Sequence, residues 1–274
     1  GEGLSELLKE LRTKLFGVLN GLDYADFDPK TDRFIKKNYS WRTLRDREIN
    51  KKDLQRSFNL TVDPNIPILA YSGRLDEQKG LELLVEVLPT LLLEYHVQFI
   101  VIGTGNPKYR EFFTNLEKQF PGLVGTHLMS DFVLPRRVFA GADLLLLPSK
   151  FEPGGIVVIE GMRYGAVPVV RSTGGLADIV TDFDPEHNTG NGFTFHTYNK
   201  LSLFGAVIRA IQVYRNDKLW DHLTRRVMKE DVSWEKAAKQ YMDLYERAIE
   251  FRRDSPRVEA GRQNPLAFVA KRIE

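Results

Sequence analysis

The sequence predicts an α/β fold in which a doubly wound, Rossmann-like parallel sheet lies between layers of helices. Three observations support this prediction. Short apolar runs alternate with helix-period segments from residue 66 onward, the runs are apolar on both faces, and glycine-rich turns follow several of them. Strands that are apolar on both faces are typical of parallel sheets covered by helices on both sides. Ligands of such sheets bind at the carboxyl ends of the strands.

Six apolar runs are expected to form the strands. They cover residues 66–71, 97–102, 123–128, 143–147, 167–171 and 192–195. After the first run, apolar residues mark one face of a helix at Leu81, Leu84, Val85, Leu88 and Leu92. Pro89 predicts a kink or a break in that helix.

The chain is expected to have three parts: residues 1–60, 61–250 and 251–274. Leucines at helical spacing predict an amphipathic helix over 1–20, and 21–60 is polar and turn-rich. Residues 200–250 are expected to be helical, with Ser233 as an N-cap and Trp234 opening the last helix. Residues 251–274 are expected to form an irregular polar tail. The chain opens Gly1-Glu2-Gly3, without an initiator Met or a signal pattern, as though cut from something longer.

The composition excludes several classes of function. Basic and acidic residues nearly cancel, 39 against 37, so nucleic acid is not an expected partner. There is no cysteine, which excludes disulfides and cysteine nucleophiles. The five histidines form no metal-ligand spacing, so neither a metal nor another cofactor is expected. The apolar runs are too short to cross a bilayer, and a cytoplasmic location is expected.

The loop after the first strand carries Gly73, Arg74 and Lys79. An arginine can bind two phosphate oxygens at once, and a lysine adds a mobile point charge. Either residue alone is best interpreted as a solvated surface charge. Two cations at one strand end favour a diphosphate site.

The loop after the second strand contains Gly103 and Gly105, which would let the backbone approach a flat ligand. Taken alone, this is an ordinary turn. A dinucleotide fingerprint of the form G-x-G-x-x-G would need glycine where Lys108 stands, which is evidence against a nicotinamide enzyme.

The segment after the fourth strand is the richest in chemistry. Pro153, Gly154 and Gly155 open a helix whose first amides would form an anion site. Glu152 precedes that helix, and Glu160 lies two turns into it in an apolar stretch. A carboxylate in such a stretch needs a partner, and sugar hydroxyls would supply one. The simpler interpretations are a helix-dipole partner for Glu152 and a partly exposed helix residue for Glu160.

A second glycine-rich turn follows the fifth strand, at Thr173, Gly174 and Gly175, and opens another short helix. Two helix N-termini at neighbouring strand ends would form a double phosphate cradle. Two unrelated turns are the alternative interpretation.

In chain order these motifs resemble the glycogen and starch synthase family. The resemblance rests on Gly73-Arg74-Leu75, Gln78-Lys79-Gly80, Phe151-Glu152-Pro153 through Glu160, Tyr164-Gly165, Pro168 and Ser172 to Leu176. The segments Val18 to Asp23, Asp28-Pro29 and Ser233-Trp234 resemble that family's interdomain segment and closing helices. The similarity covers roughly residues 15–250.

The resemblance implies the C-terminal half of a GT-B enzyme, which transfers glucose with retention from ADP-glucose or UDP-glucose to an α-1,4-glucan. Residues 61–250 would be the nucleotide-sugar-binding domain, and 1–60 the interdomain segment with its N-terminal helix. Arg74, Lys79 and Glu152 would be catalytic. The donor-binding residues would be Gly73, Gly103, Gly105, Gly154, Gly155, Ile156, Glu160, Thr173, Gly174 and Gly175.

The chain departs from the family in lacking the N-terminal domain, with its Lys-Thr-Gly-Gly-Leu loop and acceptor site. We therefore expect no activity from this chain alone. Gly154 stands where many bacterial synthases have cysteine, and some relatives have another residue in place of Glu160. Two alternatives stay open: an isolated nucleotide-sugar-binding module, and the donor domain of a related enzyme with another acceptor.

Overall fold

A computed structural model describes residues 4–254 and contains a six-stranded parallel sheet. The strands are β1 (Ile68–Ser72), β2 (Gln98–Ile102), β3 (Val124–His127), β4 (Leu144–Leu147), β5 (Val167–Arg171) and β6 (Phe193–Phe195). Their order in the sheet is β3-β2-β1-β4-β5-β6, and every pairing is parallel. The predicted doubly wound fold and all six predicted strands are confirmed.

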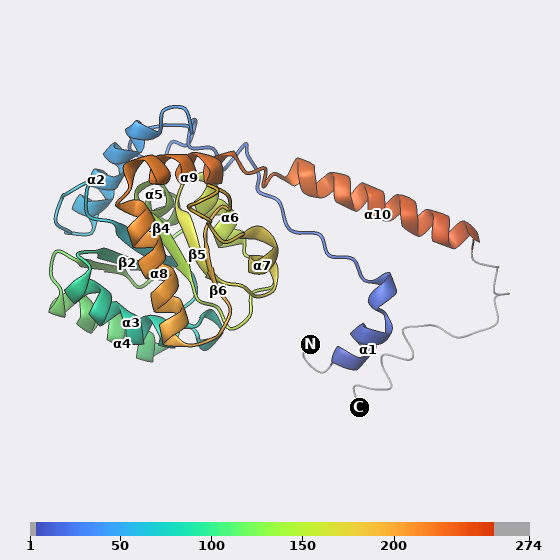
Figure 1. The fold of residues 1–274 in the computed structure, drawn as a ribbon, viewed down its shortest axis with the longest axis horizontal. Coiled ribbons are helices and arrows are strands. Elements are labelled where there is room, and N and C mark those ends of the chain that lie inside the picture. Colours follow the sequence, from blue (N-terminus) through green and yellow to red (C-terminus); the bar gives the residue numbers. More distant parts are fainter. Residues whose placement is uncertain (1–3, 255–274) are drawn as a thin grey trace. The chain divides into compact units, whose positions relative to one another are not determined.

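Helices cover both faces of the sheet (Figure 1). One group of helices that pack together consists of α3 (Leu81–Glu94), α4 (Pro107–Gln119) and α8 (Lys200–Tyr214). The other consists of α2 (Arg47–Ser57), α5 (Leu134–Gly141) and α6 (Ile156–Arg163), with the short α7 (Gly175–Ile179) beside β5. Helix α9 (Asp217–Lys229) contacts both α8 and α6. Each strand of the sheet centre is therefore shielded from water on both sides, as its apolar sequence requires.

Helix α3 carries the apolar face that the sequence indicates. Leu81, Leu84 and Leu88 are fully buried, and Leu92 is nearly so. Pro89 lies inside α3, and the helix continues through it to Glu94. The predicted break is therefore absent: burial of the leucine face compensates the hydrogen bond that proline removes.

The helix predicted over residues 1–20 is shorter than expected. It is reduced to α1 (Ser5–Glu10) and a 3₁₀ turn at Arg12–Lys14, and the remaining residues to 20 are irregular. None of the residues of α1 is buried. A short amphipathic helix without a buried residue is marginal in water, which explains why it ends early.

Residues 21–60, described from the sequence as polar and turn-rich, also contain η2 (Leu44–Asp46) and the helix α2. Helix α2 was missed because its buried face is mostly polar: Arg47, Asn50, Lys51 and Gln55 accompany a single buried leucine, Leu54. Burial of such groups is tolerated only where each finds hydrogen-bond partners. Those partners are distant in sequence, as with the bond from Gln55 Nε2 to Gln98 Oε1 at 2.8 Å.

The chain forms two compact units, Leu19–Trp234 and a second one composed of 1–18 with 235–274. The second unit contains α1 and most of α10 (Trp234–Asp254), which begins where the sequence places it. The first four residues of the expected tail, 251–254, belong instead to α10, which runs to Asp254. The remaining residues of that prediction, 255–274, lie outside the described residues. Among the helices of residues 4–254, none has the length and hydropathy needed to cross a bilayer.

Candidate functional site

The predicted site residues lie where the strand order changes direction, between β1 and β4. These two strands are hydrogen-bonded neighbours in the sheet, and the chain leaves them toward opposite sides. Ligands of open α/β sheets bind in the crevice that forms at such a switch point. A backbone hydrogen bond joins the loop after β1 to the loop after β4 there: Lys150 N donates to Gln78 O at 2.8 Å.

Lys79 and Glu152 form an ion pair across these two loops. Lys79 Nζ lies 2.6 Å from Glu152 Oε2, and Ser149 Oγ donates to the same oxygen at 3.2 Å. Their side chains are only 17% and 10% exposed. At this burial the pair is poorly screened by solvent, so it fixes the Glu152 carboxylate strongly. The structure thus brings together two of the three residues that the sequence singled out as catalytic.

Arg74, the third of them, is arranged differently. Its side chain is 67% exposed, with Nη1 3.1 Å from Asp76 Oδ2 and Nη2 3.0 Å from Gln78 Oε1. The backbone under it is fixed, because Tyr71 Oη donates to the Arg74 carbonyl at 2.6 Å. Arg74 is therefore an exposed cation on an anchored loop, where its side chain pairs with Asp76 and Gln78.

Arg74 also lines a cavity of about 290 Å³ at the carboxyl ends of β1, β2 and β3. Gly73 and Gly103 form its base, and the loop after β3 supplies Met129 and Phe132. The Phe132 side chain is 93% exposed. Sequence reasoning missed this loop, although its position after the third predicted strand was the signal that could have revealed it. A partly apolar slot with a cation at one end suits a flat ring attached to an anion.

The glycines of the first two loops serve close packing between the loops. A Cβ at Gly103 would lie 1.8 Å from Gly73 O, and one at Gly105 would lie 2.4 Å from Leu75 O. No side chain fits at either position. The backbone of the β2 loop therefore lies directly against that of the β1 loop, which sets the shape of the cavity.

The two glycine-rich turns after β4 and β5 pack against each other in the same way. Gly175 N donates to Glu152 O at 2.9 Å, and a Cβ at Gly174 would lie 2.2 Å from that oxygen. Arg171 Nε donates to His196 O at 3.1 Å, and its Nη1 donates to Ser149 O at 3.4 Å. The Thr173–Gly175 turn is thus the support of the Glu152 loop, and the Gly175 amide is used inside the protein.

Helix α6 begins at this point and has eight residues, with Gly155 as its N-cap at φ 64°. Gly154 is partly exposed, and the Ile156 side chain is 46% exposed. The first amides of a helix have no intrahelical acceptors, so the start of α6 can receive an anion next to Lys79. Helix α7 has only five residues, and its contribution to the expected double cradle is correspondingly small.

Glu160 lies within α6, apart from the Lys79–Glu152 pair. Burial raises its pKa to about 7, and the charge of Arg136 opposes this effect only in part. Within the described residues its carboxylate has no hydrogen-bond or ion-pair partner. A partly buried carboxylate of this kind is an acceptor that the folded chain leaves unused.

The raised pKa of Glu160 makes stability depend on pH in a defined direction. A carboxyl group with a higher pKa in the folded state binds its proton more tightly there, so stability is lost as pH rises from the unfolded value of 4.5 through about 7. We expect Glu160→Gln to unfold with a free energy higher than that of wild type by about 2 kcal/mol near pH 8, and by almost nothing near pH 4. Urea unfolding at both pH values tests this, and a pH-independent difference would contradict it.

Asn20 is a second residue that sequence reasoning did not assign to the site. Its Nδ2 lies 3.5 Å from the place that a Cβ of Gly154 would occupy. The segment around it is fixed to the start of α10, since Leu22 N donates to Val232 O at 2.7 Å and Trp234 N donates to Leu22 O at 3.2 Å. The close approach of Gly21 to Trp234, where a Cβ would lie 2.4 Å from Cα, requires glycine.

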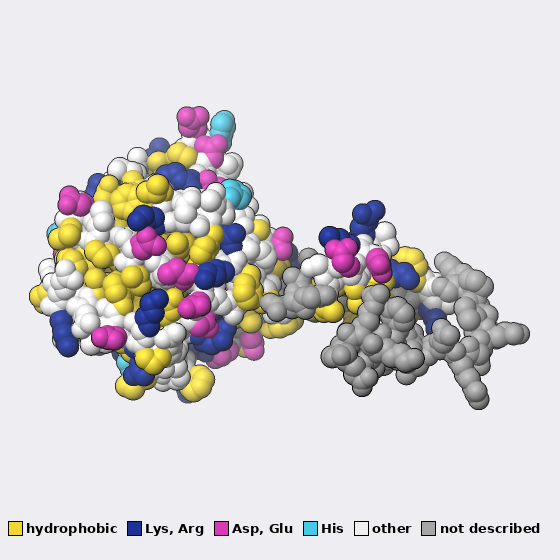
Figure 2. All heavy atoms as spheres, turned by 90° about the horizontal axis from the view of Figure 1, so that it is seen from below, with side chains coloured by type: hydrophobic (Ala, Val, Ile, Leu, Met, Phe, Trp, Pro, Cys, Tyr) yellow, Lys and Arg dark blue, Asp and Glu magenta, His cyan; other side chains and the backbone are white. Residues whose placement is uncertain are grey.

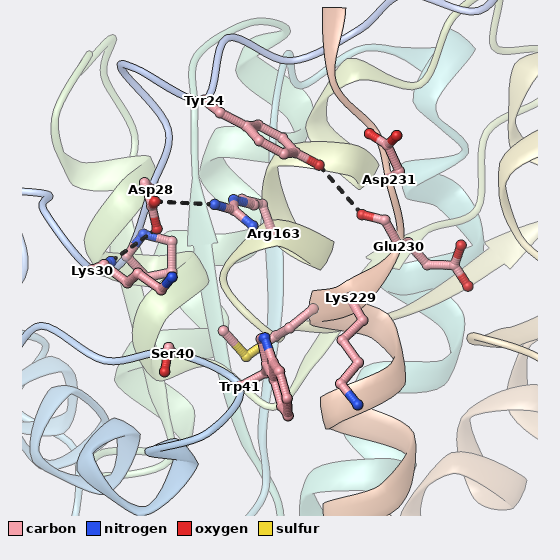
Figure 3. A pocket seen from close by; sticks show the side chains of 11 residues that line it. Tyr24, Asp28, Lys30, Ser40, Trp41, Arg163, Lys229, Glu230 and Asp231 are labelled. Atoms are coloured by element: carbon pink, nitrogen blue, oxygen red, sulfur yellow. Dashed lines mark hydrogen bonds and ion pairs between the residues drawn. The ribbon is translucent and has the colours of Figure 1, made fainter. Parts of the chain in front are cut away.

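A small pocket of about 210 Å³ is lined by residues between Tyr24 and Trp41, by Arg163 and by residues from Met228 to Asp231 (Figure 3). Tyr24 Oη donates to Glu230 O at 3.3 Å, and Arg163 Nη2 lies 3.2 Å from Asp28 Oδ2. Figure 3 shows the side chains of Trp41 and Lys229 side by side at its edge, with the Lys229 amine 4.0 Å from the ring centroid. These contacts hold residues 24–41 against α6 and the end of α9.

Basic and acidic side chains are interspersed on the face that Figure 2 shows. Over residues 4–254, no group of three or more acidic, histidine or cysteine side chains could hold a metal ion.

Comparison with known proteins identifies the family. A family model described as glycosyl transferases group 1 matches residues 53–229. The chain belongs to the group 1 glycosyltransferases. Among proteins of this kind it is 39% identical over 250 residues to a glycogen synthase of Pseudothermotoga lettingae, which covers 91% of this chain and 51% of that protein. It is 42% identical over 245 residues to a glycogen synthase of Clostridium beijerinckii, covering 89% and 51%.

A solved relative agrees with this assignment to the group 1 glycosyltransferases. The catalytic domain of starch synthase IV from Arabidopsis thaliana, bound to ADP and acarbose, superposes with a TM-score of 0.84 at 34% identity, covering 91% of this chain and 52% of that one. The chain spans about half the length of the relatives it matches. The resemblance to the C-terminal half of a glycogen or starch synthase, with its GT-B fold, is confirmed.

Proposed function

We propose that this chain is the donor-binding domain of a retaining glucosyltransferase of the glycogen or starch synthase type. Its reaction would transfer glucose from ADP-glucose or UDP-glucose to the non-reducing end of an α-1,4-glucan. The observation that carries this proposal is the buried Lys79–Glu152 pair at the switch point, beside the start of α6. The domain would comprise residues 61–250, preceded by the interdomain segment 1–60, in a cytoplasmic enzyme.

The geometry supports a separate role for each part of the site. The departing diphosphate would lie at the first turn of α6 beside Lys79, with Arg74 swinging from Asp76 and Gln78 to meet it. The Glu152 carboxylate, already oriented by Lys79 and Ser149, would accept hydroxyls of the glucosyl group. Cations placed before the reaction begins stabilise the charge that develops on the leaving group without reorganisation.

The nucleoside would occupy the remaining space. Glu160 would accept the two ribose hydroxyls, which satisfy a carboxylate that has no described partner. The base would enter the cavity formed by Gly73, Gly103 and the loop at Met129 and Phe132. The cavity accommodates either adenine or uracil, so titration of the chain with ADP-glucose and UDP-glucose is the test of the donor.

We expect the isolated chain to bind ADP equally well with and without EDTA. Lys79, Arg74 and the first turn of α6 supply the positive charge that a divalent ion would otherwise provide. Isothermal titration calorimetry in magnesium and in EDTA measures this. A large loss of affinity in EDTA would contradict it.

The same chain is expected to release no elongated glucan from ADP-glucose and maltoheptaose. It spans about half of the related synthases, and the acceptor half of the site is proposed to lie in the other half. Robust glucosyl transfer by the 274-residue chain would contradict the proposal that the acceptor half of the site lies outside this chain.

A further inference from the structure

A larger cavity lies at the opposite edge of the sheet, at the amino ends of β1 and β4. Its volume is about 690 Å³, which is in the range of small-molecule sites. Its walls are formed by the start of α2, the end of α8 and the start of α9. Asp143, just before β4, lies at its floor. We call it the amino-edge cavity. Strands of four or five residues separate it from the Lys79–Glu152 pair by roughly 15 Å.

The floor of the amino-edge cavity is charged, buried and internally satisfied. Lys51 Nζ lies 2.7 Å from Asp143 Oδ2, and it donates to Pro64 O at 2.8 Å and to Tyr214 Oη at 2.7 Å. Arg47 Nη1 lies 3.6 Å from the other Asp143 oxygen, and Ile68 N donates to Asp143 at 2.8 Å. Such a network keeps its shape without a ligand, because every group in it already has a partner.

The rim offers polar groups that the described residues leave unused. The side chains of Arg45, Asn65 and Asp217 line the cavity and have no hydrogen bond or ion pair within residues 4–254. Thr224 also lines it, is 1% exposed, and has a hydroxyl group without a hydrogen-bond partner. An unpaired buried hydroxyl costs free energy, so a site that supplied its partner would recover that cost.

Two aromatic side chains that pack against each other also line the amino-edge cavity. Tyr214 and Trp220 meet edge to face with their centroids 5.1 Å apart, and both line the cavity. Aromatic side chains present an apolar body beside a polar tip, which suits a ligand with alternating C–H and O–H surfaces.

The charged residues of the lining indicate which class of ligand the amino-edge cavity can bind. The lining carries four cations, Arg45, Arg47, Lys51 and Arg215, against four carboxylates, Glu48, Asp143, Asp217 and Asp221. A phosphate bound there would be repelled by as many carboxylates as there are cations to attract it. An apolar ligand would remove these charged groups from water without offering them hydrogen bonds. A neutral molecule with many hydroxyl groups can donate to the carboxylates and accept from the cations and the amide.

We propose that the amino-edge cavity is a second carbohydrate site, separate from the donor site, which holds a short stretch of linear α-glucan. The choice of an α-glucan among carbohydrates rests on the proposed function. A polymer held there would keep its free ends near the enzyme between transfers, because a tethered chain has a high effective concentration.

Calorimetric titration of the 274-residue chain with maltoheptaose tests the proposal. Binding is expected in the millimolar range or tighter. Asp217→Ala and Asn65→Ala are each expected to weaken it about fivefold, which is what one lost hydrogen bond with a neutral ligand removes. Both residues are exposed, so both variants are expected to fold. The matched control is His222→Ala, on the same helix as Asp217 but outside the cavity, and it should leave maltoheptaose affinity unchanged.

A parallel titration of every variant with ADP separates this proposal from the proposed function. The expected result is full ADP affinity in Asp217→Ala and Asn65→Ala, with reduced maltoheptaose affinity. Absence of maltoheptaose binding, or binding that ignores both substitutions, would overturn the second site while leaving the donor site intact. Competition by inorganic phosphate would also overturn it, because the cavity would then be an anion site. Loss of ADP binding by wild type would instead count against the donor site.

Discussion

Replacing Lys79 with alanine is expected to slow glucosyl transfer by about a hundredfold or more, measured as kcat in an enzyme that carries this domain together with an acceptor half. In the proposed reaction, negative charge builds on the departing diphosphate as the glycosidic bond breaks, and Lys79 is a partly buried cation beside the start of α6. An interaction that strengthens toward the transition state lowers kcat when it is lost, while the donor KM changes little.

Two further variants isolate this effect from damage to the fold. Lys79→Ala leaves the Glu152 carboxylate without its ion-pair partner, which is expected to destabilise the domain by about 3 kcal/mol. Adding Glu152→Gln removes that uncompensated charge, so the double variant should recover stability, which tests whether the unpaired carboxylate causes the destabilisation. Lys150→Ala is the matched control, because Lys150 pairs at 2.7 Å with Glu82 in the first turn of α3. Equal losses of kcat in Lys79→Ala and Lys150→Ala would refute the assigned role.

Gly174→Ala is expected to abolish ADP binding and to lower the free energy of unfolding by about 3 kcal/mol. A Cβ there would lie 2.2 Å from Glu152 O, a backbone atom that cannot turn aside. The backbone at Gly174, with φ 50° and ψ −136°, is also strained for any residue with a side chain. The Glu152 loop must therefore move, and with it the carboxylate and the start of α6.

The control for Gly174 is a glycine of the same chain with space around it. Gly205 lies inside α8, and nothing lies within 4 Å of the Cβ it would gain. Gly205→Ala should raise the free energy of unfolding by about 0.5–1 kcal/mol, because alanine favours the helix, and ADP affinity should stay unchanged. Urea unfolding and calorimetry measure both quantities. Unchanged ADP affinity in Gly174→Ala would show that the loop contact is dispensable.

The strands were predictable because their signal is local. The run Leu144–Leu147 predicts a strand covered on both faces from its own four residues, and all four are buried in the structure. Helix α2 was not predictable, because its buried Lys51 depends on Asp143 and Tyr214, which approach it only in the fold. The early end of α1 has the same origin, since an amphipathic pattern says nothing of whether a surface exists to bury it.

The site was predictable where residue type and strand-end position coincide. Lys79 and Glu152 satisfied both conditions, and the structure joins them. The loop at Phe132 and the amide of Asn20 gave no chemical signal, because an exposed phenylalanine and a lone asparagine are ordinary in any loop. The packing roles of Gly103 and Gly174 were hidden for another reason: the sequence shows that a glycine is present, but which backbone atom lies against it is a property of the fold.

The pairing of Leu22 with Ser233 has a consequence for how such a unit can be inherited. It brings the two ends of Leu19–Trp234 together, so the two peptide connections of this unit to the rest of its chain lie close to each other. A compact body whose ends meet can be spliced into another polypeptide, or exchanged for a homologous one, without stretching or rerouting the host backbone. If the unit binds the sugar donor as proposed, recombination could join it to a different acceptor unit, and the sugar supplied and the molecule receiving it could change independently during evolution.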